Sequence, residues 1–377
     1  MKERNIILDN FRGIAVLLVL FHHLTLINKD AFQNIFLKLL RYSMTFIVRG
    51  GWCGVDLFFV LSGFLISGLI YNEYKSTGKF KVGQFLIRRG FKLYPSFFFF
   101  ILFAFFIERV VIHDHTFNGT DYLKDALFLR NYLGGRFGHT WSLDVEEHFY
   151  ILLSLFFLYL ITKKYLNSDI LIKTYVVLLT ISLACRILSY FILHDHSSFY
   201  YTTHTRIDCL FFGVLLSYLY FFEKSRLNFI FRRKKLFTIV SLLIIASNFT
   251  LKWETNPLAL ITLSANSVCF GVLMLIALET DVKWLKNNFL SFIGKNSYAI
   301  YLWHPFINSY LLLILFSAKI DAEHVDITSK KTWVLYILLY YTCSIITGTL
   351  LTTLIEIPFL KLRNKLFPSK ARIPLVQ

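Results

Sequence analysis

Long apolar runs separated by short basic or polar segments dominate this chain. Ten of them come close to the roughly 20 apolar residues that a helix needs to cross a bilayer. The ten runs are Ile6–Ile27, Val55–Tyr71, Leu93–Ile112, Phe149–Thr162, Ile170–Leu193, Ile207–Phe222, Leu236–Leu251, Leu258–Leu278, Ser297–Phe316 and Trp333–Leu354. A bilayer offers no water to exposed backbone groups, so such runs form helices. We predict an all-α, polytopic membrane helical bundle of about ten transmembrane helices, forming one domain over residues 1–377.

Composition separates the chain from the soluble classes of protein. Of its 377 residues, 56% are hydrophobic and 17% are charged, whereas soluble domains carry about 25% charged residues. A disordered tail and a disulfide-stapled secreted domain are excluded on the same grounds. The net charge of +17 does not indicate a nucleic-acid partner, because the basic residues fall between apolar runs, where they set topology. We therefore expect the lipid bilayer to surround the protein.

The basic residues also predict an orientation. If the N-terminus lies in the cytoplasm, the segments on its side of the membrane carry most of the Lys and Arg, including those from Lys75 to Lys92 and from Lys224 to Lys235. The segments on the other side hold nearly as many acids as bases. By the positive-inside rule, and with ten spans, both termini are expected in the cytoplasm. The sequence does not indicate the oligomeric state.

Ionisable residues inside the first span are candidates for function. Arg12 and His23 are 11 residues apart, which at 100° per residue places them on one helix face about 16 Å apart. His22 lies on a neighbouring face. A charge in the hydrocarbon costs ~2.5–3.5 kcal/mol on insertion scales. Helix pairing is the alternative explanation for such residues.

Two further groups lie near the ends of the next spans. Asp56 opens the second span, where it either pairs with a neighbouring base or takes part in chemistry. Arg88, Arg89 and Lys92 precede Pro95 at the start of the third span. They are either a topology anchor or a phosphate-binding group, since guanidinium forks and helix starts both favour phosphate oxygens.

A polar segment from His139 to Tyr150 leads into the fourth span. It interleaves His139, Glu146 and Glu147 with apolar residues such as Trp141. A solvated loop is one explanation of this pattern, and a site with acid and base groups near the outer membrane face is the other.

Later polar residues complete the candidates. These are Arg206 and Asp208 at the start of the sixth span, Tyr298 and His304 in the ninth, and Glu356 at the end of the tenth. Two His-Asp-His triplets, His113–His115 and His194–His196, lack a third ligand at a suitable spacing, so we predict no metal.

Taken in order, these segments resemble the membrane-bound acyltransferase family 3, the bacterial O-acyltransferases of cell-envelope glycans. The matching segments are Leu8–Ala15 with His23, Gly54–Ile66, Arg88–Pro95, His139–Leu143 with Val145–Glu147, Arg206–Asp208, Ser297–His304 and Glu356–Pro358. The resemblance runs from residue 5 to residue 360. It implies an enzyme of the bacterial cytoplasmic (inner) membrane.

The resemblance also implies substrates and residue roles. Such proteins take an acyl group, usually acetyl, from cytoplasmic acyl-CoA and deliver it to a sugar hydroxyl at the other membrane face. Acetyl-CoA is therefore the expected donor, and a cell-envelope saccharide the expected acceptor. His23 matches the essential first-span histidine of the family, and Arg12 its companion. Arg89 matches the first arginine of an Arg-x-x-Arg motif, whose second position is Lys92 here, which keeps the charge but loses the bidentate fork.

A working mechanism follows from geometry and resemblance together. The pantetheine arm of CoA is expected along the Arg12–His23 face, with its phosphates at Arg88, Arg89 and Lys92. His23 then acts either as general base or as a transient acyl carrier. The remaining candidates fall into two groups: Glu146, Glu147 and Asp56 assist His23, and His139, Trp141, Ser142, Arg206, Asp208, Tyr298 and His304 contact the substrate. The chain length leads us to expect no appended periplasmic esterase-like domain.

Two functions from other classes remain open at this point. A transporter or flippase for a glycan or its lipid carrier also needs many spans with polar residues near the midplane. It does not explain the basic segment followed by Tyr94 and Pro95. A non-catalytic scaffold or sensor is the second alternative, and in it a buried arginine–histidine pair is an unnecessary cost.

Overall fold

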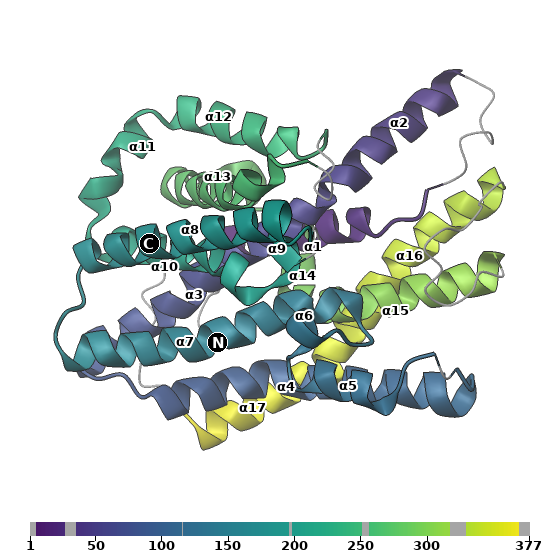
Figure 1. The fold of residues 1–377 in the computed structure, drawn as a ribbon, viewed down its shortest axis with the longest axis horizontal. Helices are drawn as coiled ribbons and strands as arrows, with labels where there is room; N and C mark the ends of the chain where they lie inside the picture. The colour runs from purple at the N-terminus through teal and green to yellow at the C-terminus, as the bar shows by residue number, and fades with distance from the viewer. Residues whose placement is uncertain are drawn as a thin grey trace.

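The computed structural model describes residues 5–26, 35–114, 116–195, 198–250, 256–316 and 329–368. Within these ranges every regular element is helical and there is no strand (Figure 1). The longer helices are α1 (Ile6–His22), α2 (Ile35–Gly50), α3 (Gly54–Thr77), α4 (Val82–Phe106), α7 (Trp141–Thr162), α8 (Ser168–Ile187), α10 (Ile207–Phe222), α12 (Lys234–Ser247), α13 (Ala259–Thr280), α15 (Ser297–Phe316) and α16 (Lys330–Leu351).

Short helices connect or extend the long ones. The short α-helices are α5 (Gly119–Ala126), α6 (Arg130–Leu133), α9 (Ser198–Tyr201), α11 (Asn228–Arg232), α14 (Asn288–Lys295) and α17 (Ile357–Leu366). The 3₁₀ and π segments are η2 (Gly51–Cys53), η3 (Ile107–Val111), η4 (Gly138–Thr140), η5 (Leu188–Ile192), η6 (Thr203–Thr205), η7 (Lys224–Leu227), η8 (Lys283–Leu285) and η9 (Thr352–Glu356).

The all-α prediction is confirmed, and each of the ten predicted spans coincides with a helix. Seven helical stretches among the described residues are long and apolar enough to cross a membrane. They are Arg41–Thr77, Val82–Val111, Gly138–Thr162, Ser168–Ile192, Ala259–Thr280, Ser297–Phe316 and Lys330–Leu366. Ile207–Phe222 is apolar but shorter. The total of ten spans and the side of the termini stay predictions, and the predicted span ends at Ile27 and Leu251 lie outside the described residues.

Two helices begin well before the predicted boundaries, and both differences matter for the site. Helix α4 begins at Val82 instead of Leu93, and α7 begins at Trp141 instead of Phe149. The charged residues in these two segments are therefore helical, and in α7 most of them are buried. They do not end the helix because they face the protein interior instead of lipid.

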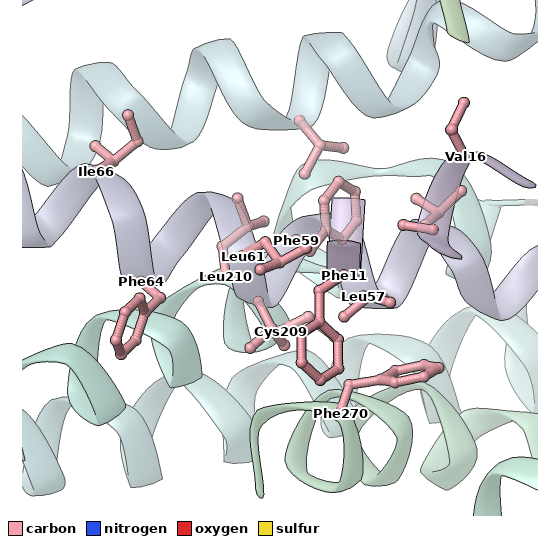
Figure 2. Packing of buried hydrophobic residues seen from close by; sticks show 14 of the residues in the cluster. Phe11, Val16, Leu57, Phe59, Leu61, Phe64, Ile66, Cys209, Leu210 and Phe270 are labelled. Carbon is pink, nitrogen blue, oxygen red and sulfur yellow. The ribbon is translucent and has the colours of Figure 1, made fainter. Parts of the chain in front are cut away.

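Helix α3 lies at the centre of one half of the bundle, in contact with α1, α10 and α13. Figure 2 shows side chains of all four helices meeting there, among them Phe59, Leu210 and Phe270. The backbones of α3 and α10 cross at two glycines. A Cβ atom on Gly63 would lie 1.9 Å from the Leu210 carbonyl oxygen, so only glycine permits this approach.

The other half of the bundle holds α4, α7, α15, α16 and α17, with α17 alongside α4 (Figure 1). Its interior is rich in rings; Phe100, for example, contacts Trp303 and Phe137. Helix α5 packs against the far end of α4 (Figure 1). The candidate site lies where the two halves meet.

Candidate active site

A cavity of 1120 Å³ follows one face of α3. Its wall includes α3 residues from Val55 to Thr77, which are 22 residues apart and span about 33 Å of helix. That distance matches the hydrocarbon thickness of a bilayer, ~30 Å. We call it the basic cavity because its wall carries seven basic side chains, namely Arg12, Lys79, Lys81, Arg88, Arg89, Lys92 and Arg363.

Three of these bases share one face of α4. Arg88 and Arg89 precede Lys92 by four and three residues, the spacings at which helical side chains are neighbours. Arg88 donates to the Phe367 carbonyl after α17. The Arg89 guanidinium lies 4.5 Å from the ring centroid of Tyr150, and no described residue accepts a hydrogen bond from its buried Nε. A half-buried cation whose Nε has no acceptor is suited to an anionic ligand.

The other end of the basic cavity is formed by Ser142 on α7 and Tyr301 on α15. The Tyr301 hydroxyl donates to the His139 carbonyl oxygen over 2.8 Å. Its own oxygen is 2.6 Å from Ser142 Oγ. Because the Tyr301 proton is already donated, the Ser142 hydroxyl is the donor of this second bond.

Four imidazoles lie in a row beside Tyr301, and we call them the histidine cluster. The ring centroids of His22 and His23 are 5.2 Å apart, those of His23 and His304 are 5.0 Å apart, and those of His304 and His139 are 5.7 Å apart. The tertiary structure thus joins the end of α1, the middle of α15 and η4.

The hydrogen bonds of this cluster determine where its protons lie. Nδ1 of His304 is 2.7 Å from the Tyr301 carbonyl oxygen. A carbonyl only accepts, so Nδ1 carries the hydrogen and Nε2 keeps its lone pair. His304 is fully buried, and no described residue bonds to Nε2. By the same reasoning Nε2 of His139 donates to the Leu302 carbonyl oxygen over 3.0 Å.

Pro305 explains why the Tyr301 carbonyl is available to His304. In an α-helix this oxygen accepts from the N–H four residues later. That residue is Pro305, inside α15, and proline has no backbone N–H. The His304 side chain takes the place of the missing donor. The adjacent His304 and Pro305 in the sequence therefore make a base with a defined tautomer.

The sequence suggested that Glu146 and Glu147 assist the His23 imidazole, but in the structure both carboxylates have other partners. Glu146 lines the basic cavity and accepts hydrogen bonds from Ser62 Oγ, over 2.9 Å, and from the Tyr150 hydroxyl. Glu147 accepts from the Tyr94 hydroxyl over 2.9 Å. No hydrogen bond among the described residues joins either carboxylate to the histidine cluster. Glu146 instead lines the basic cavity, and both carboxylates interact electrostatically with Arg89.

Asp56, Arg206 and Asp208 form buried ion pairs, and their partners are not members of the histidine cluster. Asp56 pairs with Arg206, and both side chains are fully buried. Asp208 pairs with Arg186 over 2.7 Å. Asn266 also donates to Asp56 over 2.7 Å. These pairs tie α3, α8, α10 and α13 together.

Trp141 and Tyr298 occupy different places. The Trp141 ring lies 5.8 Å from the Arg206 guanidinium, so it belongs with the buried ion pair. Tyr298 lines the basic cavity, and its hydroxyl donates to the Leu93 carbonyl over 2.9 Å. Of the predicted substrate contacts, Ser142 and Tyr298 therefore lie on the basic cavity, and His139 and His304 lie in the histidine cluster.

We expect Asp56→Asn to act on stability. Removing one partner of a buried ion pair typically costs about 3–5 kcal/mol, because the remaining charge is left uncompensated. Denaturation of the purified protein in detergent should show this loss of stability. The rate of the expected acyl transfer, measured per folded molecule, should be retained. Asp169→Asn is the matched control, since Asp169 forms an exposed ion pair with Arg226 over 3.4 Å. Unchanged stability with lost transfer would instead support chemistry at Asp56.

Sequence reasoning did not select some residues of this site. Tyr301 lies inside the segment Ser297–His304, and Ser62 inside Gly54–Ile66. The features that could have identified them are the position of Tyr301 one turn before His304 and the position of Ser62 on one face of α3. Arg363 also lines the basic cavity and was not among the residues selected from the sequence. In the part of the chain that the structure describes, no three potential ligands could hold a metal ion; His115 and His196 lie outside that part.

A second cavity lies at the other end of α4, with a volume of 340 Å³. Its wall includes Glu108, Arg130, Arg136 and His139, and we call it the Arg130 cavity. Glu108 follows Arg88 by 20 residues along α4 and η3, which is about 30 Å. The two cavities thus reach the His139–Tyr301 contact from opposite ends of one helix.

Fold and site together define a multi-pass helical membrane protein with a basic cavity that leads to a histidine cluster. A family model described as an acyltransferase domain matches residues 5–353, and the chain belongs to this family, acyltransferase family 3. The resemblance seen in the sequence motifs is confirmed.

Individual relatives agree with the family. The chain is 29% identical to a provisionally named O-acetyltransferase of Staphylococcus aureus strain COL over 335 residues, covering 80% of this chain and 51% of the relative. It is 28% identical to O-acetyltransferase OatA of S. aureus strain NCTC 8325 over 341 residues, with the same shares covered. The chain therefore spans about half the length of these relatives. No solved structure matches it.

Proposed function

We propose that this protein is an O-acetyltransferase of the bacterial cytoplasmic membrane. It moves an acetyl group from cytoplasmic acetyl-CoA to a sugar hydroxyl of a cell-envelope glycan at the outer face. The observation that carries this proposal is the basic cavity, which runs along α3 from seven basic side chains to Tyr301 beside the histidine cluster. The names of the relatives support acetyl as the group transferred.

The basic cavity suits the parts of acetyl-CoA in order. The phosphates of acetyl-CoA carry negative charge, and Arg88, Arg89 and Lys92 offer cations on one helix face. The buried, unpartnered Nε of Arg89 is suited to a phosphate oxygen. The rest of the wall along α3, with Phe58, Leu65 and others, is mainly apolar, which fits a slender pantetheine arm. The thioester would then lie near Tyr301.

The histidine cluster supplies a base for the reaction. The sugar hydroxyl loses its proton to an imidazole nitrogen while its oxygen attacks the thioester carbonyl. The C–S bond breaks, and the CoA thiolate takes up the proton, so the products are the acetyl ester and CoA thiol. His304 Nε2 holds a lone pair, and its ring contacts that of His23. We assign general base catalysis to this pair.

Inside-out membrane vesicles test the proposal, because their cytoplasmic face is accessible. Labelled acetyl-CoA is added outside the vesicles, and label on the enclosed saccharide is measured for the wild type and for His23→Ala. We expect label with the wild type, and a loss of at least about 100-fold with His23→Ala, the lower range for a general base. His204→Ala is the control, because His204 is an exposed histidine bonded to Tyr132.

The outcomes separate the classes of function. Full transfer by folded His23→Ala would contradict the role of His23. If the wild type transferred no acetyl group but moved a saccharide across the membrane without acetyl-CoA, the protein would be a transporter instead.

A further inference from the structure

The Arg130 cavity has the chemistry of a saccharide site with a positive charge in it. We propose that it binds one sugar unit of the acceptor that carries a carboxylate or phosphate close to the hydroxyl to be acetylated. This inference rests on the proposed function and names the substrate class of its acceptor side. The cavity lies at the Glu108 end of α4, away from the bases that would hold CoA.

Aromatic side chains give the cavity flat apolar surfaces. Phe117, Phe137, Phe306 and Tyr310 all contribute to its wall. The Phe306 and Tyr310 rings are 4.4 Å apart and only 37° from parallel. Binding pockets for small molecules typically combine such apolar surfaces with a few placed polar groups. The C–H face of a sugar ring matches these surfaces.

Most of the charge in the cavity is already paired. Arg136 donates to both Glu108 carboxylate oxygens, over 2.8 Å each. The Tyr122 hydroxyl donates to Glu108 as well. This bidentate pair is a strong hydrogen-bonding arrangement, so it forms a neutral, rigid part of the wall. It offers hydroxyl-binding edges but little net charge.

Arg130 is the cation that remains for a ligand. It opens α6 and is half-buried, and no described residue accepts a hydrogen bond from its buried Nε. Its side chain runs beside Gly135, in the turn before η4, and Gly138, the first residue of η4. A Cβ on Gly135 would lie 2.7 Å from Arg130 Cγ, and one on Gly138 would lie 3.4 Å from Nη2. The absence of side chains there gives the guanidinium room at the cavity wall.

Two carboxylates interact electrostatically with Arg130, namely Asp125 and Asp144, and both accept hydrogen bonds from other donors; Asp144 accepts from the Asn131 backbone N–H over 2.9 Å. Asp125 accepts from the backbone N–H groups of Arg136 and Phe137, over 2.7 and 3.1 Å, and from Thr140 Oγ1 over 3.0 Å. Burial raises the pKa of this carboxyl to about 6, although these bonds and Arg130 lower it. Asp125 therefore holds the turn in place, and the Arg130 fork is left for an external oxyanion.

The position of the cavity connects binding to chemistry. His139 and Pro305 belong to its wall, and His139 contacts the His304 ring. A sugar whose anionic group rests on Arg130 and whose ring lies on Phe306 would present a neighbouring hydroxyl to the histidine cluster. The acetyl group and the acceptor would then meet from the two cavities.

Binding can be measured without turnover by saturation-transfer difference NMR on the protein in nanodiscs. The probes are methyl glucuronoside, glucose 6-phosphate and neutral methyl glucoside, and inorganic phosphate, which has no C–H protons to observe, is measured as a competitor of glucose 6-phosphate. We expect the two charged sugars to bind at least tenfold more tightly than methyl glucoside. In Arg130→Gln this preference should disappear, whereas Arg130→Lys should keep part of it and Lys124→Gln, on the surface of α5, should keep all of it.

Each contrary outcome identifies what is wrong. Equal binding of charged and neutral sugars by the wild type, or an unchanged preference in Arg130→Gln, overturns the role of Arg130. Inorganic phosphate binding as tightly as glucose 6-phosphate overturns the sugar part of the site. Whichever of the two charged sugars binds more tightly shows whether the acceptor carries a uronic acid or a phosphate. Charged-sugar binding without acetyl transfer in vesicles would leave this site intact and refute the proposed function.

Discussion

Replacing His304 by alanine is expected to lower acetyl transfer by about 100- to 10,000-fold, the range for loss of a general base. The fully buried His304 keeps the lone pair of Nε2 next to the His23 ring, because its Nδ1 hydrogen is held by the Tyr301 carbonyl. The acetyl-CoA KM should change little, since His304 does not line the basic cavity. Steady-state rates with detergent-solubilised enzyme measure both quantities.

Pro305→Ala provides a sharper version of the same test. Alanine restores the backbone N–H that proline lacks, and this N–H would compete with His304 for the Tyr301 carbonyl. The imidazole would then lose its defined tautomer while every side chain of the cluster remained. We expect reduced kcat, an altered pH profile and an unchanged acetyl-CoA KM. A lower yield of folded protein with a wild-type pH profile would show that Pro305 only shapes the helix.

Replacing Arg89 by glutamine is expected to raise the KM for acetyl-CoA by about 10- to 100-fold and to leave kcat nearly unchanged. A hydrogen bond to a charged group is worth about 1.5–3 kcal/mol, and 1.4 kcal/mol is about tenfold in affinity. Arg89 lies on the wall of the basic cavity, and the buried Nε has no acceptor among the described residues. Its loss removes ground-state binding, so it appears in KM.

Two comparisons make the Arg89 prediction specific. Lys92→Arg supplies a second guanidinium fork on the same face of α4, and it should lower the KM. An acetyl thioester of dephospho-CoA lacks one phosphate, and the Arg89→Gln penalty should shrink with it if that phosphate is the partner. Lys163→Gln, at the end of α7, changes a charge outside the basic cavity and is the control. An Arg89→Gln enzyme with normal KM and low kcat would place Arg89 in catalysis.

The residues of the proposed donor side could be selected from the sequence in part. Arg88, Arg89 and Lys92 were chosen as a group of cations just before the third span, and all three line one cavity with Arg12. They share one face because α4 begins earlier than predicted, at Val82, so that helix periodicity places all three side chains together. His23 was selected because a polar residue inside an apolar run is costly and therefore stands out in the sequence.

Partners on different helices were not predictable in the same way. The sequence left two roles possible for Asp56, an ion pair or a part in the chemistry. Only the crossing of α3 and α10 brings it to Arg206. Glu146 was expected near His23, but it faces Ser62 across the α3–α7 contact. Charge and residue type make both roles plausible, and the choice depends on which helices pack together.

The apolar runs by themselves determined that this protein is a helical membrane bundle, because a bilayer leaves the backbone no other way to satisfy its hydrogen bonds. The motifs determined the family. Only the tertiary structure decided that His304 stands between His23 and His139, and that two cavities end beside them. Those facts depend on how α1, α4, α7 and α15 pack, and helix packing is set by shape complementarity between surfaces that are far apart in the sequence.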